Sequence, residues 1–228
     1  MIPLGTSARV PVFPFVTYAL VIANVVVFVQ ELTAADTDAF INAFAAIPYD
    51  ITNGVVLAPP SPPIPALTLV TSMFLHAGFL HIIFNMLFLA VFGPELEYVC
   101  GHIGYLLYYL LCGILGGVLQ VAVDPGSHVP AIGASGAIAG ILGGYIITAP
   151  GSTVGTVIPI GCLPLFFRLP AVVVIGFWAA AQFLHGWGAI TTKTLGEQGG
   201  GTAYFAHIGG FASGVILLPL FRRRRSVG

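Results

Sequence analysis

Charged side chains are scarce in this sequence of 228 residues. Asp, Glu, Lys and Arg make up 7% of it, against about 25% in soluble proteins. So few charges exclude an ordinary soluble domain, and the formal net charge of −1 argues against a general affinity for nucleic acid. Hydrophobic residues account for 57% of the sequence, so we predict an integral membrane protein surrounded by a lipid bilayer.

Metal-binding and redox patterns are also missing. The sequence has three cysteines, and their spacing fits neither a disulfide framework nor a zinc knuckle. It contains no His-Glu-x-x-His pattern for a zinc-bound water and no pair of aspartates within an apolar stretch. These residues therefore give no support for a metal site or a disulfide framework.

Long apolar stretches fill most of the chain. A helix needs about 20 apolar residues to cross roughly 30 Å of hydrocarbon. Six stretches approach this length, which predicts one all-α membrane domain over residues 1–228 with a long outer loop at 31–65. The predicted spans are residues 14–30, 80–94, 103–123, 135–149, 170–185 and 204–221.

The long outer loop and the positive charges add two expectations. Phe40, Phe44 and Ile47 recur at helical spacing, which predicts either a short helix resting on the bilayer or an ordinary loop. Arg9, Arg168 and the run at 222–225 share one side of a six-span chain, with Lys193 as a mild exception. Because positive charges favour the inside, we predict a multi-pass protein of the plasma (cytoplasmic) membrane with both termini in the cytoplasm.

Four polar residues lie near the starts of three spans. His81 and Asn85 fall in the second span, Ser135 opens the fourth, and His207 lies in the first turn of the sixth. All three spans begin on the predicted outer side, and the i, i+4 spacing of His81 and Asn85 puts both on one helix face. We therefore expect the four side chains to converge near the outer membrane face.

Each of these residues taken singly has an ordinary explanation, such as helix packing for Ser135 or an interhelical hydrogen bond for Asn85. Glycines favour a closer association of the fourth and sixth spans. They recur every four residues, which lets helix backbones approach each other and would bring Ser135 to His207. The repeats are Gly136, Gly140 and Gly144 in one span, and Gly210 and Gly214 in the other.

The eight acidic residues distinguish a catalytic triad from a dyad. All of them fall in predicted loops or at the ends of predicted spans, so none is placed to orient His207: Glu31, Asp36, Asp38, Asp50, Glu95, Glu97, Asp124 and Glu197. We predict a Ser135–His207 dyad, with His81, Asn85 and the first N–H groups of the fourth span as donors to an oxyanion. The other histidines, at 76, 102, 128 and 185, are expected to be structural or solvated.

These residues resemble the motifs of rhomboid intramembrane serine proteases. The motifs are residues 74–86 with His81 and Asn85, residues 93–101 followed by Tyr108, the Gly133-Ala134-Ser135-Gly136 segment, and residues 206–214 with His207.

The resemblance implies a six-helix core, a Ser135 nucleophile, a His207 general base, and an oxyanion hole of His81, Asn85 and the Ser135 N–H. Gly133, Gly136 and Gly210 would support this site. Implied substrates are single-pass membrane proteins, cut near the outer membrane face through an acyl-enzyme. They would enter laterally past the fifth span and the loop from Ala189 to Gly201, without a metal or cofactor. The glycine-rich run Gly199–Gly201 in this loop is compatible with a mobile cap.

Two features depart from the family pattern. Residues 31–65 contain no tryptophan-arginine pair, so the anchoring of the outer loop is open. Ala139 stands where some relatives stack an aromatic ring on the histidine, so His207 must be held otherwise, by the Gly199–Gly201 run or by neighbours in the second and fifth spans.

Two other functions fit the composition. One is a non-catalytic rhomboid-like binder of transmembrane helices, against which the presence of both Ser135 and His207 speaks. The other is a small transporter or channel, which is disfavoured because the spans show no internal repeat and no intramembrane acid.

Overall fold

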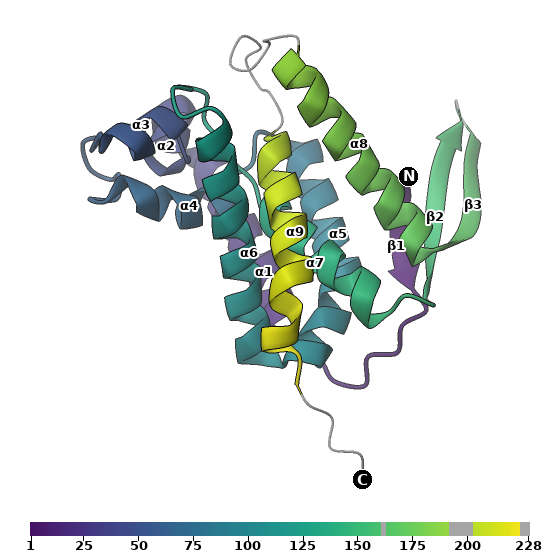
Figure 1. Cartoon of the computed structure of the whole chain (residues 1–228). Coiled ribbons are helices and arrows are strands. Elements are labelled where there is room, and N and C mark those ends of the chain that lie inside the picture. Colours follow the sequence, from purple (N-terminus) through teal and green to yellow (C-terminus); the bar gives the residue numbers. More distant parts are fainter. Residues whose placement is uncertain (161–162, 192–202, 224–228) are drawn as a thin grey trace.

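Figure 1 shows a computed structural model of the chain, which describes residues 1–160, 163–191 and 203–223. A helix occupies each of the six predicted spans: α1 (Phe15–Thr33), α5 (Phe79–Cys100), α6 (His102–Val123), α7 (Ser135–Thr148), α8 (Ala171–Thr191) and α9 (Tyr204–Phe221). Four of them, α1, α5, α6 and α9, are long and apolar enough to cross a bilayer, whereas α7 and the stretch Ala171–Gly186 of α8 are shorter apolar helices. The chain is therefore a multi-pass membrane protein, and the number of six crossings stays a prediction.

Short helices fill the predicted outer loop and the approach to α5. They are α2 (Thr37–Phe44), α3 (Pro48–Asn53), η1 (Pro65–Leu67), α4 (Thr68–Thr71) and η2 (Ser72–Phe74). The predicted helix is confirmed in α2, which contains Phe40 and Phe44, whereas Ile47 lies beyond its end. Asp36 caps α2 by accepting a hydrogen bond from the Ala39 N–H at 2.9 Å.

A small β-sheet corrects the all-α prediction. Strands β1 (Ile2–Thr6), β2 (Thr153–Ile160) and β3 (Leu163–Pro170) form an antiparallel sheet in the order β1-β2-β3. In Figure 1 this sheet lies beside α8. The prediction places β2 and β3 in a plain connection between two spans, and it assigns no element to the residues of β1. The Val, Ile and Thr residues of β2 favour a strand. Its partner β1 lies at the start of the chain, far from β2 in the sequence.

Two helices extend beyond their predicted ends and bury acidic residues. Pro94 was taken as the end of the second span, but α5 continues through it to Cys100. Glu95 and Glu97 therefore lie inside a helix, and Glu31 lies in the last turn of α1, which runs to Thr33. Glu31 agrees with the prediction that every acidic residue lies in a loop or at a span end, whereas Glu95, inside α5, corrects it. All three side chains are buried.

Glu97 joins the start of α1 to the end of α5. Its carboxylate accepts hydrogen bonds from the Val16 N–H at 2.8 Å, and from the Thr17 N–H and hydroxyl at 2.7 Å. His102, at the start of α6, lies 2.5 Å from the same carboxylate. A negative charge at a helix N-terminus is favourable because the first N–H groups have no partner within the helix. Glu97 thus fastens three helices at one end of the bundle.

Replacing Glu97 by alanine is expected to lower the free energy of unfolding by roughly 2 to 4 kcal/mol, because buried N–H groups lose their acceptor. Glu97→Gln keeps one accepting oxygen, so it should lower the free energy of unfolding by less than Glu97→Ala. Asp38→Ala, which removes a carboxylate from an exposed position, is the control and should change little. Thermal unfolding in detergent measures all three; equal stability of Glu97→Ala and the unmodified protein would contradict this role.

Candidate active site

Glycines bring α7 and α9 into backbone contact. A Cβ atom at Gly210 would overlap the carbonyl oxygen of Gly136, and one at Gly214 would overlap that of Gly140. The predicted close packing of the two glycine-rich faces is therefore confirmed. The Tyr108 hydroxyl of α6 lies 2.8 Å from the carbonyl oxygens of both Gly140 and Gly214, which ties a third helix to this contact.

This packing brings Ser135 and His207 together. Ser135 is the first residue of α7 and His207 lies in the first turn of α9. The Ser135 Oγ is 2.6 Å from the His207 Nε2, with His207 only 7% exposed. A hydroxyl at hydrogen-bond distance from an imidazole has the geometry that a serine nucleophile needs from its base.

Two side chains of α8, Gln182 and Trp178, also contact the His207 ring. The Gln182 Oε1 lies 2.7 Å from His207 Nδ1, and the Trp178 ring lies 5.8 Å from the imidazole, between centroids. These contacts come from the fifth span, one of the regions expected to compensate for Ala139. The sequence analysis did not predict Gln182, because it carries no charge and belongs to none of the motifs. A polar amide one helical turn after Trp178 in an apolar helix was the available signal.

His81 borders the same space as Ser135. The Ala77 N–H donates to His81 Nδ1 at 3.2 Å, which leaves the ring proton on Nε2 and makes that nitrogen a donor. Gly133, with φ of +118°, separates this nitrogen from the serine: a Cβ there would lie 2.8 Å from His81 Nε2 and 3.6 Å from Ser135 Oγ. Only glycine leaves this space open.

Asn85 lies one turn after His81 on α5 and is buried. Its Nδ2 makes no hydrogen bond to any other part of the chain that the structure describes. A buried amide donor without a partner is costly, so an unused donor here is compatible with a ligand that arrives from outside.

Backbone hydrogen bonds anchor the segment before Ser135 to the outer loop and to η2. Ala46 and Ala131 exchange two hydrogen bonds of 3.1 and 2.9 Å, and the Gly133 N–H donates to the Ser72 carbonyl at 2.8 Å. The Tyr49 ring stacks on His128 at 4.1 Å between centroids. In the absence of a tryptophan-arginine pair, these contacts hold the outer loop against the site.

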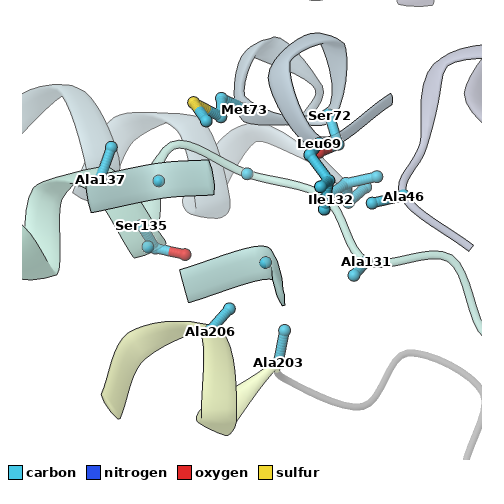
Figure 2. Close-up of a pocket in the computed structure, with 14 residues that line it drawn as sticks. Ala46, Leu69, Ser72, Met73, Ala131, Ile132, Ser135, Ala137, Ala203 and Ala206 are labelled. Atoms are coloured by element: carbon cyan, nitrogen blue, oxygen red, sulfur yellow. The ribbon is translucent and has the colours of Figure 1, made fainter. Parts of the chain in front are cut away.

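A small pocket opens beside Ser135 (Figure 2). Its volume is about 30 Å³, close to the volume that one water molecule takes up in the liquid. Small residues such as Ala137 and Ala206 border it together with the larger Leu69, Met73 and Ile132. Figure 2 shows Ser135 between Ala137 of α7 and Ala206 of α9.

The remaining histidines have structural contacts. The His76 N–H donates to the Glu31 carboxylate at 3.0 Å, and its ring lies 5.0 Å from that of His81. Burial, assisted by the neighbouring His81, lowers the pKa of His76 to about 4, so this imidazole is neutral at physiological pH. His185 contacts the Tyr204 ring at 5.5 Å. Lys193 and the proposed cap at Gly199–Gly201 lie outside the described residues.

Residues 65–224 match the family model described as the rhomboid domain. The chain therefore belongs to the rhomboid family. It is 40% identical over 81 residues to the rhomboid protease GluP of Bacillus subtilis, which covers 36% of this chain and 15% of GluP. It is 41% identical over 75 residues to rhomboid-type serine protease 2 of Emericella nidulans, covering 33% of this chain and 15% of that protein.

A third relative differs in its name. The chain is 30% identical over 78 residues to inactive rhomboid protein 1 of Drosophila melanogaster, covering 34% of this chain and 5% of that protein. In all three relatives the chain spans well under half of their length. Family membership alone thus leaves both a protease and a non-catalytic member open.

Proposed function

We propose that this protein is an intramembrane serine endopeptidase that cleaves transmembrane segments of single-pass membrane proteins. The observation that carries the proposal is the distance of 2.6 Å between Ser135 Oγ and His207 Nε2. Glycine contacts between backbones fix this distance, because α7 and α9 can approach so closely only where both present glycine.

The reaction begins when the Ser135 Oγ attacks the carbonyl carbon of the scissile peptide. His207 Nε2 takes the hydroxyl proton as the new carbon–oxygen bond forms. The resulting oxyanion receives hydrogen bonds from the Ser135 N–H at the start of α7, from His81 Nε2–H and from Asn85 Nδ2–H. Donors fixed in advance are effective because they need no reorganisation during the reaction.

Collapse of the tetrahedral intermediate breaks the carbon–nitrogen bond. His207 returns its proton to the leaving nitrogen, which departs as an amine, and Ser135 is left as an ester. Water then attacks the ester carbonyl while His207 takes its proton, and the second collapse releases a carboxylic acid and regenerates the Ser135 hydroxyl.

The substrate must unwind before it reaches Ser135. Each backbone group freed from a helix in lipid needs a new partner, so substrates should carry small or helix-breaking residues near the cut. We propose lateral entry past α8.

The topology of the proposed enzyme is six crossings with both termini in the cytoplasm of a plasma-membrane protein. The contacts of Glu97 with Val16 and of the Arg223 N–H with the Val99 carbonyl support it, because they bring the start of α1 and the end of α9 to the same end of α5. Arg9 precedes α1 and Arg222 follows α9, so positive charge gathers at this end.

Labelling with a serine-directed fluorophosphonate tests the proposal. Reconstituted protein should become labelled and should cut a reporter transmembrane segment, and Ser135→Ala should abolish both. A protein that binds the reporter helix but is neither labelled nor active would instead be a non-catalytic binder; the name of the Drosophila relative calls that protein inactive.

A further inference from the structure

The orientation of His207 depends on an uncharged partner from a third helix. We propose that Gln182 of α8 is the positioning residue of the catalytic histidine and takes the place that a carboxylate holds in a serine-protease triad. This inference rests on the proposed function. It follows from the contact of 2.7 Å between Gln182 Oε1 and His207 Nδ1.

The two contacts of the imidazole require one arrangement of protons. A neutral histidine has one ring nitrogen that donates and one that accepts. If the Nδ1–H donates to the Gln182 carbonyl oxygen, Nε2 is free to accept the Ser135 proton across 2.6 Å. If instead the Gln182 amide donated to Nδ1, the ring proton would sit on Nε2 and the serine would have no base. With its Oε1 facing Nδ1, Gln182 holds the tautomer that the reaction needs.

An amide suits this position because the site lies in an apolar bundle. A carboxylate would be costly there unless it were paired, whereas a glutamine carbonyl accepts the Nδ1–H without adding charge. The same hydrogen bond becomes stronger when His207 takes the serine proton, since its donor is then charged. Gln182 thus favours the transition state over the resting state.

The surroundings of Gln182 allow this idea to be tested by substitution. Gln182 and His207 both line a cavity of about 200 Å³ between α8 and α9. Phe183 lines the same cavity and is largely exposed, and it has no polar atom for the imidazole. A change at 182 therefore meets open space, and Phe183→Leu provides a control that alters the cavity without removing a hydrogen bond.

The decisive variants are Gln182→Met, which keeps the length of the side chain but has no strong acceptor, and Gln182→Glu, which keeps an accepting oxygen whether or not it is ionised. Gln182→Met should lower kcat for reporter cleavage, and the rate of fluorophosphonate labelling, by roughly 10- to 100-fold, the order expected for one lost buried hydrogen bond. KM should stay nearly unchanged. Gln182→Glu should restore most of the lost rate, and Phe183→Leu should match the unmodified protein.

Two results would overturn the inference. One is a Gln182→Met protein with the kcat of the unmodified protein; the other is a Gln182→Glu protein as slow as Gln182→Met. Failure of the proposed function is distinguishable, because the unmodified protein would then be neither labelled nor active. Thermal unfolding in detergent accompanies each assay, and a loss of rate that tracks loss of stability in both Gln182 variants also overturns the positioning role.

Discussion

Replacing His207 by alanine is expected to lower kcat/KM for reporter cleavage by about 10⁴- to 10⁶-fold, the range seen when a serine hydrolase loses its base. The Ser135 hydroxyl is a weak nucleophile on its own, and His207 Nε2 at 2.6 Å is the group that can take its proton. Ser135→Ala should have an effect of similar size, because either change removes the same step.

The double variant sharpens this prediction. If Ser135 and His207 act as one unit, Ser135→Ala/His207→Ala should be no slower than either single variant. The measurement is cleavage of the reporter in liposomes over long incubation, with His185→Ala as the control, since that histidine contacts only Tyr204 among the side-chain rings of the described residues. A His207→Ala protein that keeps more than about a tenth of the activity would contradict general-base catalysis by His207.

The second large effect concerns the contact between α7 and α9. Gly210→Ala is expected to lower activity at least about 100-fold, because its methyl group would overlap the Gly136 carbonyl oxygen and must push the helices apart. A displacement of about 1 Å at a catalytic pair has an effect of this order. Stability should fall as well, by about 1 to 3 kcal/mol.

Gly176→Ala on α8 is the matched control, since nothing lies within 4 Å of a Cβ at that position. Alanine is also the better helix former, so this variant should be neutral or slightly stabilised. Activity assays and thermal unfolding in detergent measure both variants. Full activity in Gly210→Ala would show that the backbone contact does not set the distance between Ser135 and His207.

The features that could be predicted are those with local signals. The helix after Gly133 begins at Ser135 and α9 spans Tyr204–Phe221 as expected, because glycines and polar residues mark those boundaries. The end of α5 was misplaced because a proline in a membrane helix does not always end it. The pairing of β1 with β2 has no local signal, since it depends on residues far apart in the chain.

The proposed catalytic pair, Ser135 and His207, and the residue proposed to position it differ in the same way. Ser135 and His207 stand out because a nucleophile and an ionisable ring are unusual in apolar stretches. Gln182 carries no charge, and its importance depends on which face of α8 meets α9. Packing in three dimensions decides which face of α8 meets α9. The sequence therefore indicated the fifth span as a source of support for His207 but did not indicate which residue.

One consequence of the position of Gln182 concerns timing. Both the amide and the Trp178 ring that contact His207 belong to α8, and neither belongs to the α7–α9 pair that carries Ser135 and His207. If α8 swings aside to admit a helix from the lipid, the histidine loses its partner for as long as α8 stays displaced. Under the proposed function, admission of a substrate and cleavage of its peptide bond would then be separated in time, because His207 regains its partner only after α8 has returned.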